Sequence, residues 1–325
     1  MERSVEFLSQ GDTLRGTLFR PDDAGEGPLP TVVMGGGWCY VKEIVLPHVA
    51  RIVNLAGVQC LGFDYRGFGE SDGARRQHLD PWWQIEDYKN AITYLESRDD
   101  VDADAIGAFG ISYSGGHVLI LAATDPRVKA VVSIVPVVDG YENMKRIHGE
   151  LRFRELEKLL LDDRRARYDG KGGYMPMSTK RPSEELASWP IPQTNEVFLQ
   201  IKEAEAPLHE HYNTVESTEN LINYTVFPFV GRILNTPVLA LVAENDNLTL
   251  WDLEIEAFNQ IPSPSKELVV MSGISHLSIY SKRPDTNVAA THASRFFGKH
   301  LAGLERVEPL EAALASAAEL EATPV

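Results

Sequence analysis

The chain has 325 residues, of which 43% are hydrophobic and 24% are charged. A chain of this size and apolar content buries a large core, which excludes an intrinsically disordered protein and a disulfide-stapled mini-protein. Its 47 acidic residues outnumber its 31 lysines and arginines, so the formal net charge is -16. Such a surface repels nucleic-acid phosphates and anionic lipids, and we therefore expect neither nucleic acid nor a membrane as a partner.

Three further features bear on the compartment. The only cysteines, Cys39 and Cys60, have neither metal-site nor redox-motif spacing. Residues 1–7 lack the apolar core of a signal peptide. The longest apolar stretch, near residues 131–138, is far shorter than the roughly 20 residues that span a bilayer. These features predict a cytoplasmic protein.

The chain begins with a predicted antiparallel hairpin, in which residues 5–8 and 14–19 flank Gly11-Asp12. After a loop rich in proline and glycine, residues 31–34 form a short apolar run that is typical of a strand buried on both faces. Strands and helices then alternate. The remaining predicted strands are 58–63, 105–109, 128–135, 237–242 and 267–271, and the predicted helices are 44–56, 81–97, 118–123, 250–258 and 288–301. This alternation predicts an α/β fold with a mostly parallel sheet flanked by helices.

The alternation is interrupted between Gly140 and Arg232, where charge is dense and no convincing parallel strand occurs. We predict that residues 1–139 and 233–304 are two parts of one core, and that residues 140–232 are a mainly helical cap inserted between them. Residues 305–325 form a tail rich in alanine and glutamate.

The most informative segment is Gly110-Ile111-Ser112-Tyr113-Ser114-Gly115, which joins a predicted buried strand directly to a helix. Such a turn holds its middle residue strained and exposed at the carboxyl edge of the sheet, and small neighbours let strand and helix approach closely. The pattern predicts Ser112 as a nucleophile. The alternative is a glycine-rich turn without catalysis, and the second hydroxyl of Ser114 leaves open a share in the chemistry.

A serine nucleophile needs a base and an acid that orients the base, and in this architecture they follow in the order serine, acid, histidine. Asp246 follows a late predicted strand and is the first choice for the acid, while Glu244 and Asp139 are the rivals. His276 lies in the loop after the next strand and is the predicted base.

The other histidines fit structural positions better. His292 and His300 belong to the last helix, and His117 is expected to pack against the sheet. His209 and His211 form an H-x-H pair without an apparent third ligand, so no metal site is predicted.

The loop Gly35-Gly36-Gly37-Trp38-Cys39-Tyr40 follows the first parallel strand and allows a close approach of backbone to ligand. An acyl-transfer intermediate requires backbone N–H donors for its oxyanion, and we assign them to Trp38 and Tyr113. Gly37, Cys39 and Tyr40 are predicted to contact substrate. A phosphate-binding loop is excluded because no Gly-Lys-Ser/Thr and no G-x-G-x-x-G pattern follows, so we predict no cofactor.

These motifs together resemble a known superfamily. The run Asp64-Tyr65-Arg66-Gly67-Phe68-Gly69-Glu70-Ser71, the Ser112 turn, Asp246 and His276 occur in the order seen in α/β hydrolases. Val41-Lys42-Glu43, Asp80-Pro81-Trp82 and Tyr113-Ser114-Gly115-Gly116-His117 are similar to the dienelactone-hydrolase-like and S15-peptidase-like branch. That branch includes bacterial esterases and acyl hydrolases of the polyketide-transferase type. The resemblance implies a Ser112–Asp246–His276 triad and a cap at residues 140–232.

The chain departs from this branch in one place. Relatives commonly carry His-Gly-x-Gly-Gly before Val-Lys-Glu, whereas this chain has Gly36-Gly37-Trp38-Cys39-Tyr40. The departure removes a histidine that anchors the loop, and it is expected to place bulk at the mouth of the site.

The residues therefore predict a serine hydrolase that cleaves a small-molecule ester, thioester or lactone without metal or cofactor. The same triad also supports an acyltransferase or a C–C bond hydrolase, and a third alternative is a non-catalytic ligand-binding protein. Aromatic residues of the cap are expected either to line an acyl site or to pack the cap on the core: Phe153, Tyr168, Tyr174, Trp189, Phe227 and Phe229. A homodimer is compatible with the sequence but not specified by it.

Overall fold

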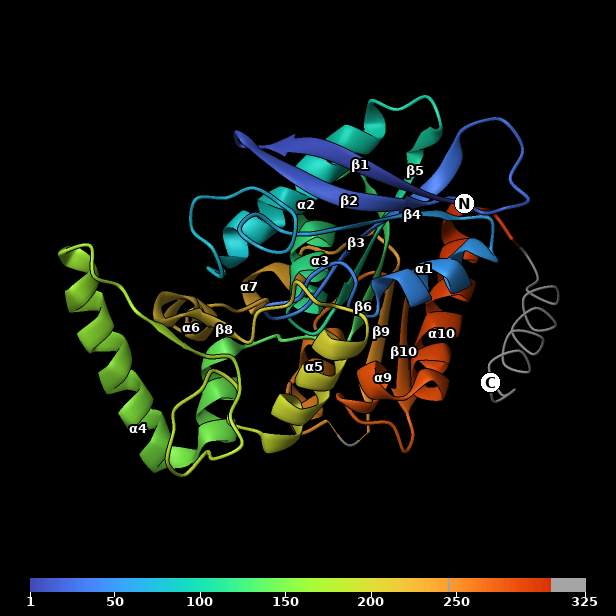
Figure 1. The fold of residues 1–325 in the computed structure, drawn as a ribbon. Helices are drawn as coiled ribbons and strands as arrows, with labels where there is room; N and C mark the ends of the chain where they lie inside the picture. The colour runs from blue at the N-terminus through green and yellow to red at the C-terminus, as the bar shows by residue number, and fades with distance from the viewer. Residues whose placement is uncertain (245, 305–325) are drawn as a thin grey trace, which may run out of the picture.

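The computed structural model describes residues 1–244 and 246–304, so the predicted tail at 305–325 lies outside the described residues. A sheet of eight strands forms the centre of the molecule, in the order β1-β2-β4-β3-β5-β6-β9-β10 (Figure 1). Its strands are β1 (Glu2–Ser9), β2 (Asp12–Phe19), β3 (Leu29–Gly35), β4 (Gln59–Phe63), β5 (Val101–Ile111), β6 (Val128–Ile134), β9 (Val238–Ala243) and β10 (Lys266–Met271). Among the strand pairs of this sheet in the described residues, β1–β2 and β2–β4 are antiparallel and the others are parallel. The predicted hairpin and the mostly parallel sheet are confirmed.

Helices cover both faces of this sheet. Figure 1 shows α1 (Leu46–Asn54) and α10 (Arg283–Leu301) on one side, and α2 (Pro81–Glu96) and α3 (Tyr113–Thr124) on the other. Two further helices, α8 (Trp251–Asn259) and α9 (Ser278–Ser281), follow β9 and β10. The parallel strands end at one edge of the sheet, where ligands bind in folds of this kind.

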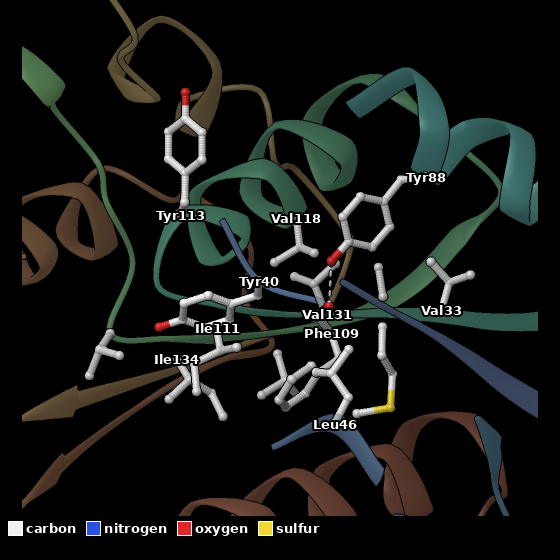
Figure 2. Close-up of a cluster of buried hydrophobic side chains, with 14 of the residues drawn as sticks. Val33, Tyr40, Leu46, Tyr88, Phe109, Ile111, Tyr113, Val118, Val131 and Ile134 are labelled. Atoms are coloured by element: carbon white, nitrogen blue, oxygen red, sulfur yellow. Dashed lines mark hydrogen bonds between the residues drawn. The ribbon is translucent and has the colours of Figure 1, made fainter. Parts of the chain in front are cut away.

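The core lies between the central strands and their helices, and it supports the turn that carries Ser112. Figure 2 shows Phe109 and Ile111 of β5 packed with neighbouring strands and helices. Tyr88 of α2 is fully buried, and its hydroxyl donates to the carbonyl of Phe109 at 2.7 Å. Because every side chain along the second half of β5 is buried, the strand holds its carboxyl end rigidly in place.

Residues 140–232, here called the intervening segment, connect β6 to β9. They form α4 (Gly140–Tyr168), β7 (Tyr174–Pro176), α5 (Pro192–Ala204), β8 (Tyr212–Thr214), α6 (Val215–Ile222) and α7 (Phe227–Val230). The two short strands pair with each other and not with the large sheet. Helix α4 bends at Gly149, whose φ of 71° is outside the helical range. In Figure 1, α4 extends away from the body of the molecule.

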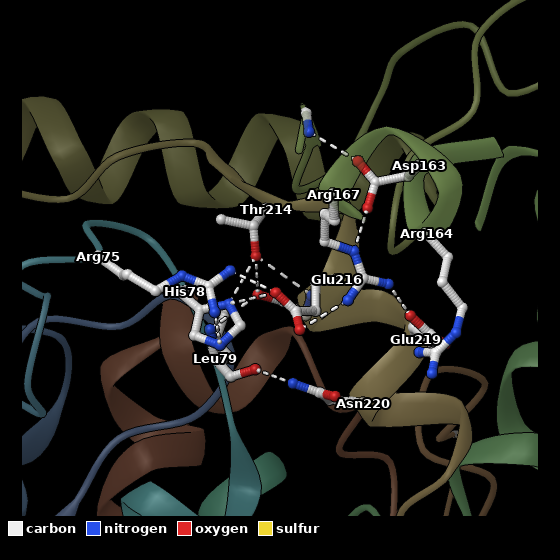
Figure 3. Close-up of polar contacts among 12 residues, drawn as sticks. Arg75, His78, Leu79, Asp163, Arg164, Arg167, Thr214, Glu216, Glu219 and Asn220 are labelled. Atoms are coloured by element: carbon white, nitrogen blue, oxygen red, sulfur yellow. Dashed lines mark hydrogen bonds and ion pairs between the residues drawn. The ribbon is translucent and has the colours of Figure 1, made fainter. Parts of the chain in front are cut away.

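An ion-pair network attaches the intervening segment to the core (Figure 3). Arg75, in the loop between β4 and α2, pairs with Glu216 of α6. Arg167 of α4 pairs with the same carboxylate at 2.7 Å and also with Asp163 at 2.8 Å. The hydroxyl of Thr214 lies 2.9 Å from Nδ1 of His78. These half-buried contacts fix α4 and α6 against one loop of the core. None of the described helices is long and apolar enough to cross a membrane.

Candidate active site

The turn between β5 and α3 places Ser112 in a strained conformation. Its φ of 60° and ψ of -120° are unusual for a residue with a side chain, and such strain is concentrated at functional sites. Gly110 is required here because a Cβ at this position would lie 2.1 Å from the carbonyl oxygen of Ser114. The backbone therefore has the geometry of a nucleophile elbow at the position that the sequence predicts.

The second serine of this turn has a structural partner on both sides. The Ser114 hydroxyl accepts a hydrogen bond from the backbone N–H of Ile111 at 2.8 Å and donates to the carbonyl of Gly35 at 2.7 Å. Ser114 is fully buried. Its hydroxyl therefore ties the elbow to the end of β3, which explains why serine replaces the usual second glycine.

The loops after β9 and β10 bring together the predicted acid and base. Nδ1 of His276 lies 2.9 Å from Oδ2 of Asp246, and both side chains are buried. The other carboxylate oxygen of Asp246 accepts the backbone N–H groups of Leu248 and Thr249 at 2.8 and 2.9 Å. Burial alone raises the pKa of Asp246, but the adjoining His276 and these backbone donors outweigh it and hold the pKa below its usual value. Asp246 is thus built to remain ionised.

The two rival acids have other partners. Glu244 accepts from the Ser272 hydroxyl at 2.8 Å and from the backbone N–H of Gly273 at 2.9 Å, so it braces the loop that carries His276. Asp139 caps α4 by accepting the backbone N–H of Glu142 at 2.9 Å. Both contacts are those of structural carboxylates.

The surroundings of Ser112 are aromatic and closed. The rings of Tyr40 and Tyr280 are buried beside each other, with their centroids 5.4 Å apart, and burial raises the pKa of both phenols. The ring centroid of Tyr280 lies 5.7 Å from that of His276. A Cβ on Gly37 would lie 2.9 Å from the Cβ of Ser112. Ser112 and His276 are only 3% and 1% exposed.

One atom of the base is left free. Nε2 of His276 is buried and has no hydrogen-bond partner among the residues that the structure describes. It is the ring nitrogen opposite the one that faces Asp246. A histidine with one nitrogen held by a carboxylate and the other free has the arrangement that a general base requires.

The glycine-rich loop (residues 35–40) is held by the intervening segment. The indole N–H of Trp38 donates to Oδ1 of Asn213 at 3.1 Å, and Nδ1 of His209 donates to the carbonyl of Cys39 at 3.0 Å. The Cys39 thiol lies 3.7 Å from the carbonyl oxygen of Tyr212. Cys39 and Tyr40 are therefore buried under the segment and do not form an open rim, contrary to the expected bulk at the mouth. His209 supplies an anchor that the loop itself lacks.

The predicted oxyanion donors lie on the two elements that meet at Ser112. Tyr113 is the first residue of α3, where backbone N–H groups have no acceptor within the helix and the helix dipole favours negative charge. Trp38 lies in the turn of the glycine-rich loop, and its ring packs 5.1 Å from the ring of Tyr113. The two residues are adjacent in space.

Two motifs of the family resemblance, Val41-Lys42-Glu43 and the run 64–71, contact each other next to this loop. The ammonium of Lys42 lies 3.1 Å from a carboxylate oxygen of Asp64 and 2.6 Å from one of Glu70. The backbone N–H of Lys42 also donates to Asp64 at 2.7 Å. The motifs are therefore parts of one buried support for the glycine-rich loop.

Of the remaining residues that the sequence analysis singled out, some lie near the site and others do not. His117 is buried, and its ring nitrogens lie 2.9 Å from Gln84 of α2 and 3.0 Å from Tyr224 of the intervening segment. The ring centroids of His209 and His211 are 5.7 Å apart. In residues 1–244 and 246–304, no group of three or more histidine, cysteine or acidic side chains could hold a metal ion. Tyr168 and Tyr174 are exposed, so they do not line an acyl site. Trp189 packs 6.1 Å from Trp38.

Several residues of the site carried no signal in the sequence. Phe198 of α5 packs 5.0 Å from Tyr40 and 5.5 Å from Tyr280. Thr249 bonds Asp246 through its hydroxyl at 2.9 Å, and Asn213 holds Trp38. Of these residues, Thr249 alone follows a local sequence pattern, because Asp-x-x-Thr places a hydroxyl beside the preceding carboxylate.

Comparison with known proteins agrees with this architecture. The family model described as X-Pro dipeptidyl-peptidase (S15 family) matches residues 10–277. The thiohydrolase aneE of Aspergillus aculeatus is 29% identical, over 81% of this chain and 82% of its own length. The polyketide transferase claH of Penicillium crustosum is 28% identical, over 85% and 90%. The crystal structure of the α/β hydrolase GrgF from Penicillium sp. sh18 superposes with a TM-score of 0.77 at 25% identity, covering 93% of this chain and 99% of that one. The chain therefore has the α/β-hydrolase fold and belongs to the S15 family.

Proposed function

We propose that this protein is a serine hydrolase that cleaves a carboxylic ester, thioester or lactone of a small molecule through an acyl-enzyme on Ser112. The observation that carries the proposal is the strained Ser112 at the elbow together with the buried His276–Asp246 pair, whose Nε2 is free. Family membership and the relatives named as thiohydrolase and polyketide transferase support an enzyme of the hydrolase or acyltransferase kind.

In the proposed mechanism, His276 takes the proton of Ser112 through Nε2 as the Ser112 oxygen attacks the carbonyl carbon. Asp246 holds the imidazole by its Nδ1–H and stabilises the imidazolium that forms. The oxyanion of the tetrahedral intermediate accepts from the backbone N–H groups of Trp38 and Tyr113. His276 then protonates the leaving group, and a water that it deprotonates releases the acid.

We further propose that the intervening segment is a cap over this site. It contributes Phe198, Trp189 and Asn213 to the surroundings of the glycine-rich loop. Gly37 and Tyr40 would contact the acyl group beside Ser112, and Cys39 would shape the loop from behind. Because Ser112 is 3% exposed, substrate entry requires displacement of part of the cap.

One observation favours a second candidate, acyl transfer to a bound alcohol, thiol or amine. The nucleophile and the base are both buried beneath aromatic side chains, which limits the access of water to an acyl-enzyme. A relative named as a polyketide transferase is consistent with this alternative. Product analysis with p-nitrophenyl esters of different chain length, with and without an added acceptor, separates the two reactions.

The decisive experiment is intact mass after treatment with a fluorophosphonate probe. We expect one adduct on the wild type and on Ser114→Ala, and none on Ser112→Ala, because in the proposed mechanism His276 activates Ser112. Esterase activity of Ser112→Ala should fall at least about 10³-fold. An unlabelled wild type, or an adduct that survives Ser112→Ala, would contradict the proposal.

A further inference from the structure

A second buried carboxyl lies directly behind the Asp246–His276 pair. Glu254 of α8 is 2% exposed, and its Oε2 has no hydrogen-bond partner within the described part of the chain. Its Oε1 lies 2.8 Å from the hydroxyl of Thr249. The same hydroxyl is 2.9 Å from Oδ2 of Asp246 and 3.1 Å from Nδ1 of His276. One threonine oxygen therefore connects two carboxyls and an imidazole.

The number of protons in this cluster is limited. A threonine hydroxyl carries a single proton, so it can donate to only one of the two carboxyls. If both carboxyls were ionised, one of them would face the Thr249 oxygen without a proton between them, and two negative charges would share a buried site. A proton on Oε1 of Glu254 removes this conflict, because that O–H can donate to Thr249 while Thr249 donates to Asp246.

The choice of Glu254 as the protonated group follows from the donors around each carboxyl. Asp246 accepts two backbone N–H groups and the imidazole, all of which favour its ionised form. Within the described residues, the Glu254 carboxyl has only the Thr249 hydroxyl as a donor. A bare Oε2 also costs less as the carbonyl oxygen of a neutral acid than as part of a carboxylate.

The electrostatic surroundings agree with this assignment. Burial raises the pKa of Glu254 well above its ordinary value, and the negative charges of Asp246 and Asp252 add to the effect. Asp252 belongs to the first turn of α8 and pairs on the surface with Arg146 at 2.6 Å. Strand β9 and helix α7, which pack against α8, consist of residues without titratable side chains.

We propose that Glu254 is a positioning residue for the triad, a protonated carboxyl that donates through Thr249 to the carboxylate of Asp246. The hydrogen bonds then run from Glu254 to Thr249 and on to Asp246, which also accepts from His276. This arrangement fixes Oδ2 of Asp246 and keeps a single negative charge beside the imidazole. It rests on the proposed function, because it assumes that Asp246 and His276 serve Ser112.

The test is the rate of fluorophosphonate labelling as a function of pH, which needs no knowledge of the natural substrate. Glu254→Gln keeps a neutral donor of the same shape, so we expect its labelling rate to stay within about threefold of wild type. The fall in rate toward acidic pH, here called the acidic limb, should occur at the same pH as in the wild type. Glu254→Leu removes the donor and should slow labelling about tenfold. Asp252→Asn, which removes an exposed carboxylate from the same helix, is the matched control and should match wild type.

The same measurement can overturn the assignment. If Glu254 were ionised in the wild type, Glu254→Gln would remove a negative charge near His276 and lower the pKa of the acidic limb by about one unit or more. Loss of labelling by equal factors in Glu254→Gln and Glu254→Leu would likewise exclude a donor role and leave only packing.

A double variant tests whether Thr249 carries the effect. We expect the double variant Thr249→Val/Glu254→Leu to be labelled as fast as Thr249→Val alone, because the connection through Thr249 is already broken. A labelling rate reduced by the product of the two single effects would contradict the connection. Melting temperatures of all variants separate slow labelling from partial unfolding. A wild type that is never labelled would overturn the proposed function and this inference with it. A labelled wild type with a shifted Glu254→Gln limb would overturn the inference alone.

Discussion

At the scale of single residues, the site depends on the close approach of backbone segments at two glycines. The elbow needs Gly110 because the Ser114 carbonyl occupies the space of a side chain, and the glycine-rich loop needs Gly37 because the Ser112 Cβ does. Both distances are shorter than any real Cβ contact. These two glycines therefore set how closely the glycine-rich loop can approach Ser112.

Gly37→Ala tests whether the position of the glycine-rich loop controls the reactivity of Ser112. The added methyl group would meet Cβ of Ser112 at 2.9 Å and the ring of Tyr40 at 3.0 Å, so the loop must move away from the nucleophile. We expect fluorophosphonate labelling to slow about 100-fold, since small displacements at an oxyanion site have large effects. Gly231→Ala, where a Cβ meets nothing within 4 Å, is the control. Labelling of Gly37→Ala at the wild-type rate would show that the loop is not part of the machinery.

At the scale of elements, the loop 35–40 and the strand β8 act together. Asn213 of β8 accepts from the Trp38 indole and from the Ser188 hydroxyl with the same oxygen, and all three side chains are buried. Breaking this contact leaves the buried indole N–H of Trp38 without its acceptor, whereas the Ser188 hydroxyl still has the Thr218 hydroxyl at 2.8 Å.

Asn213→Leu keeps the volume and removes the acceptor. We expect kcat for a p-nitrophenyl ester to fall about tenfold, and the free energy of unfolding to fall by about 1–3 kcal/mol, because the buried indole N–H of Trp38 loses its acceptor. Kinetics and urea denaturation of the variant measure the two effects. Asn223→Ala, which changes an exposed asparagine at the end of α6, should behave like wild type. An unchanged kcat in Asn213→Leu would mean that the loop holds its shape without β8.

The sequence predicts the elements of the core more fully than the site. Strand β5 running into α3, and polar loops after β9 and β10, are local patterns, so Ser112, Asp246 and His276 could be proposed from spacing alone. The contacts of Asn213 with Trp38 and of His209 with Cys39 join residues about 170 positions apart. No periodicity encodes such contacts. Glu254 was missed for another reason, since an acidic residue in a helix is usually exposed.

At the scale of the whole molecule, buried neutral histidines make the fold sensitive to acid. Burial lowers the pKa of His117 to about 3, and burial together with nearby positive charge lowers that of His209 to about 4. In the unfolded chain a histidine titrates near pH 6.5. As the pH falls from about 6.5 to about 4, the unfolded state therefore binds protons that the folded state does not.

We expect the free energy of unfolding to decrease over this range by up to about 1.4 kcal/mol per pH unit for each such histidine, and to gain nothing from them above pH 6.5. Urea denaturation at several pH values measures the slope. His117→Gln can still bond Gln84 or Tyr224 but does not titrate, so its slope should be shallower. A slope equal to that of wild type would show that His117 does not contribute.

The anchoring of the glycine-rich loop also bears on how this enzyme can diverge. If the intervening segment only covered Ser112, it could be exchanged between relatives as a unit to change substrate preference. Here the residues 209–213 complete the hydrogen bonding of residues 38–39, so the two stretches are constrained to change in concert. Chimeras that transplant residues 140–232 without residues 35–40 would inherit a mismatched loop, and productive recombination requires both stretches from the same parent.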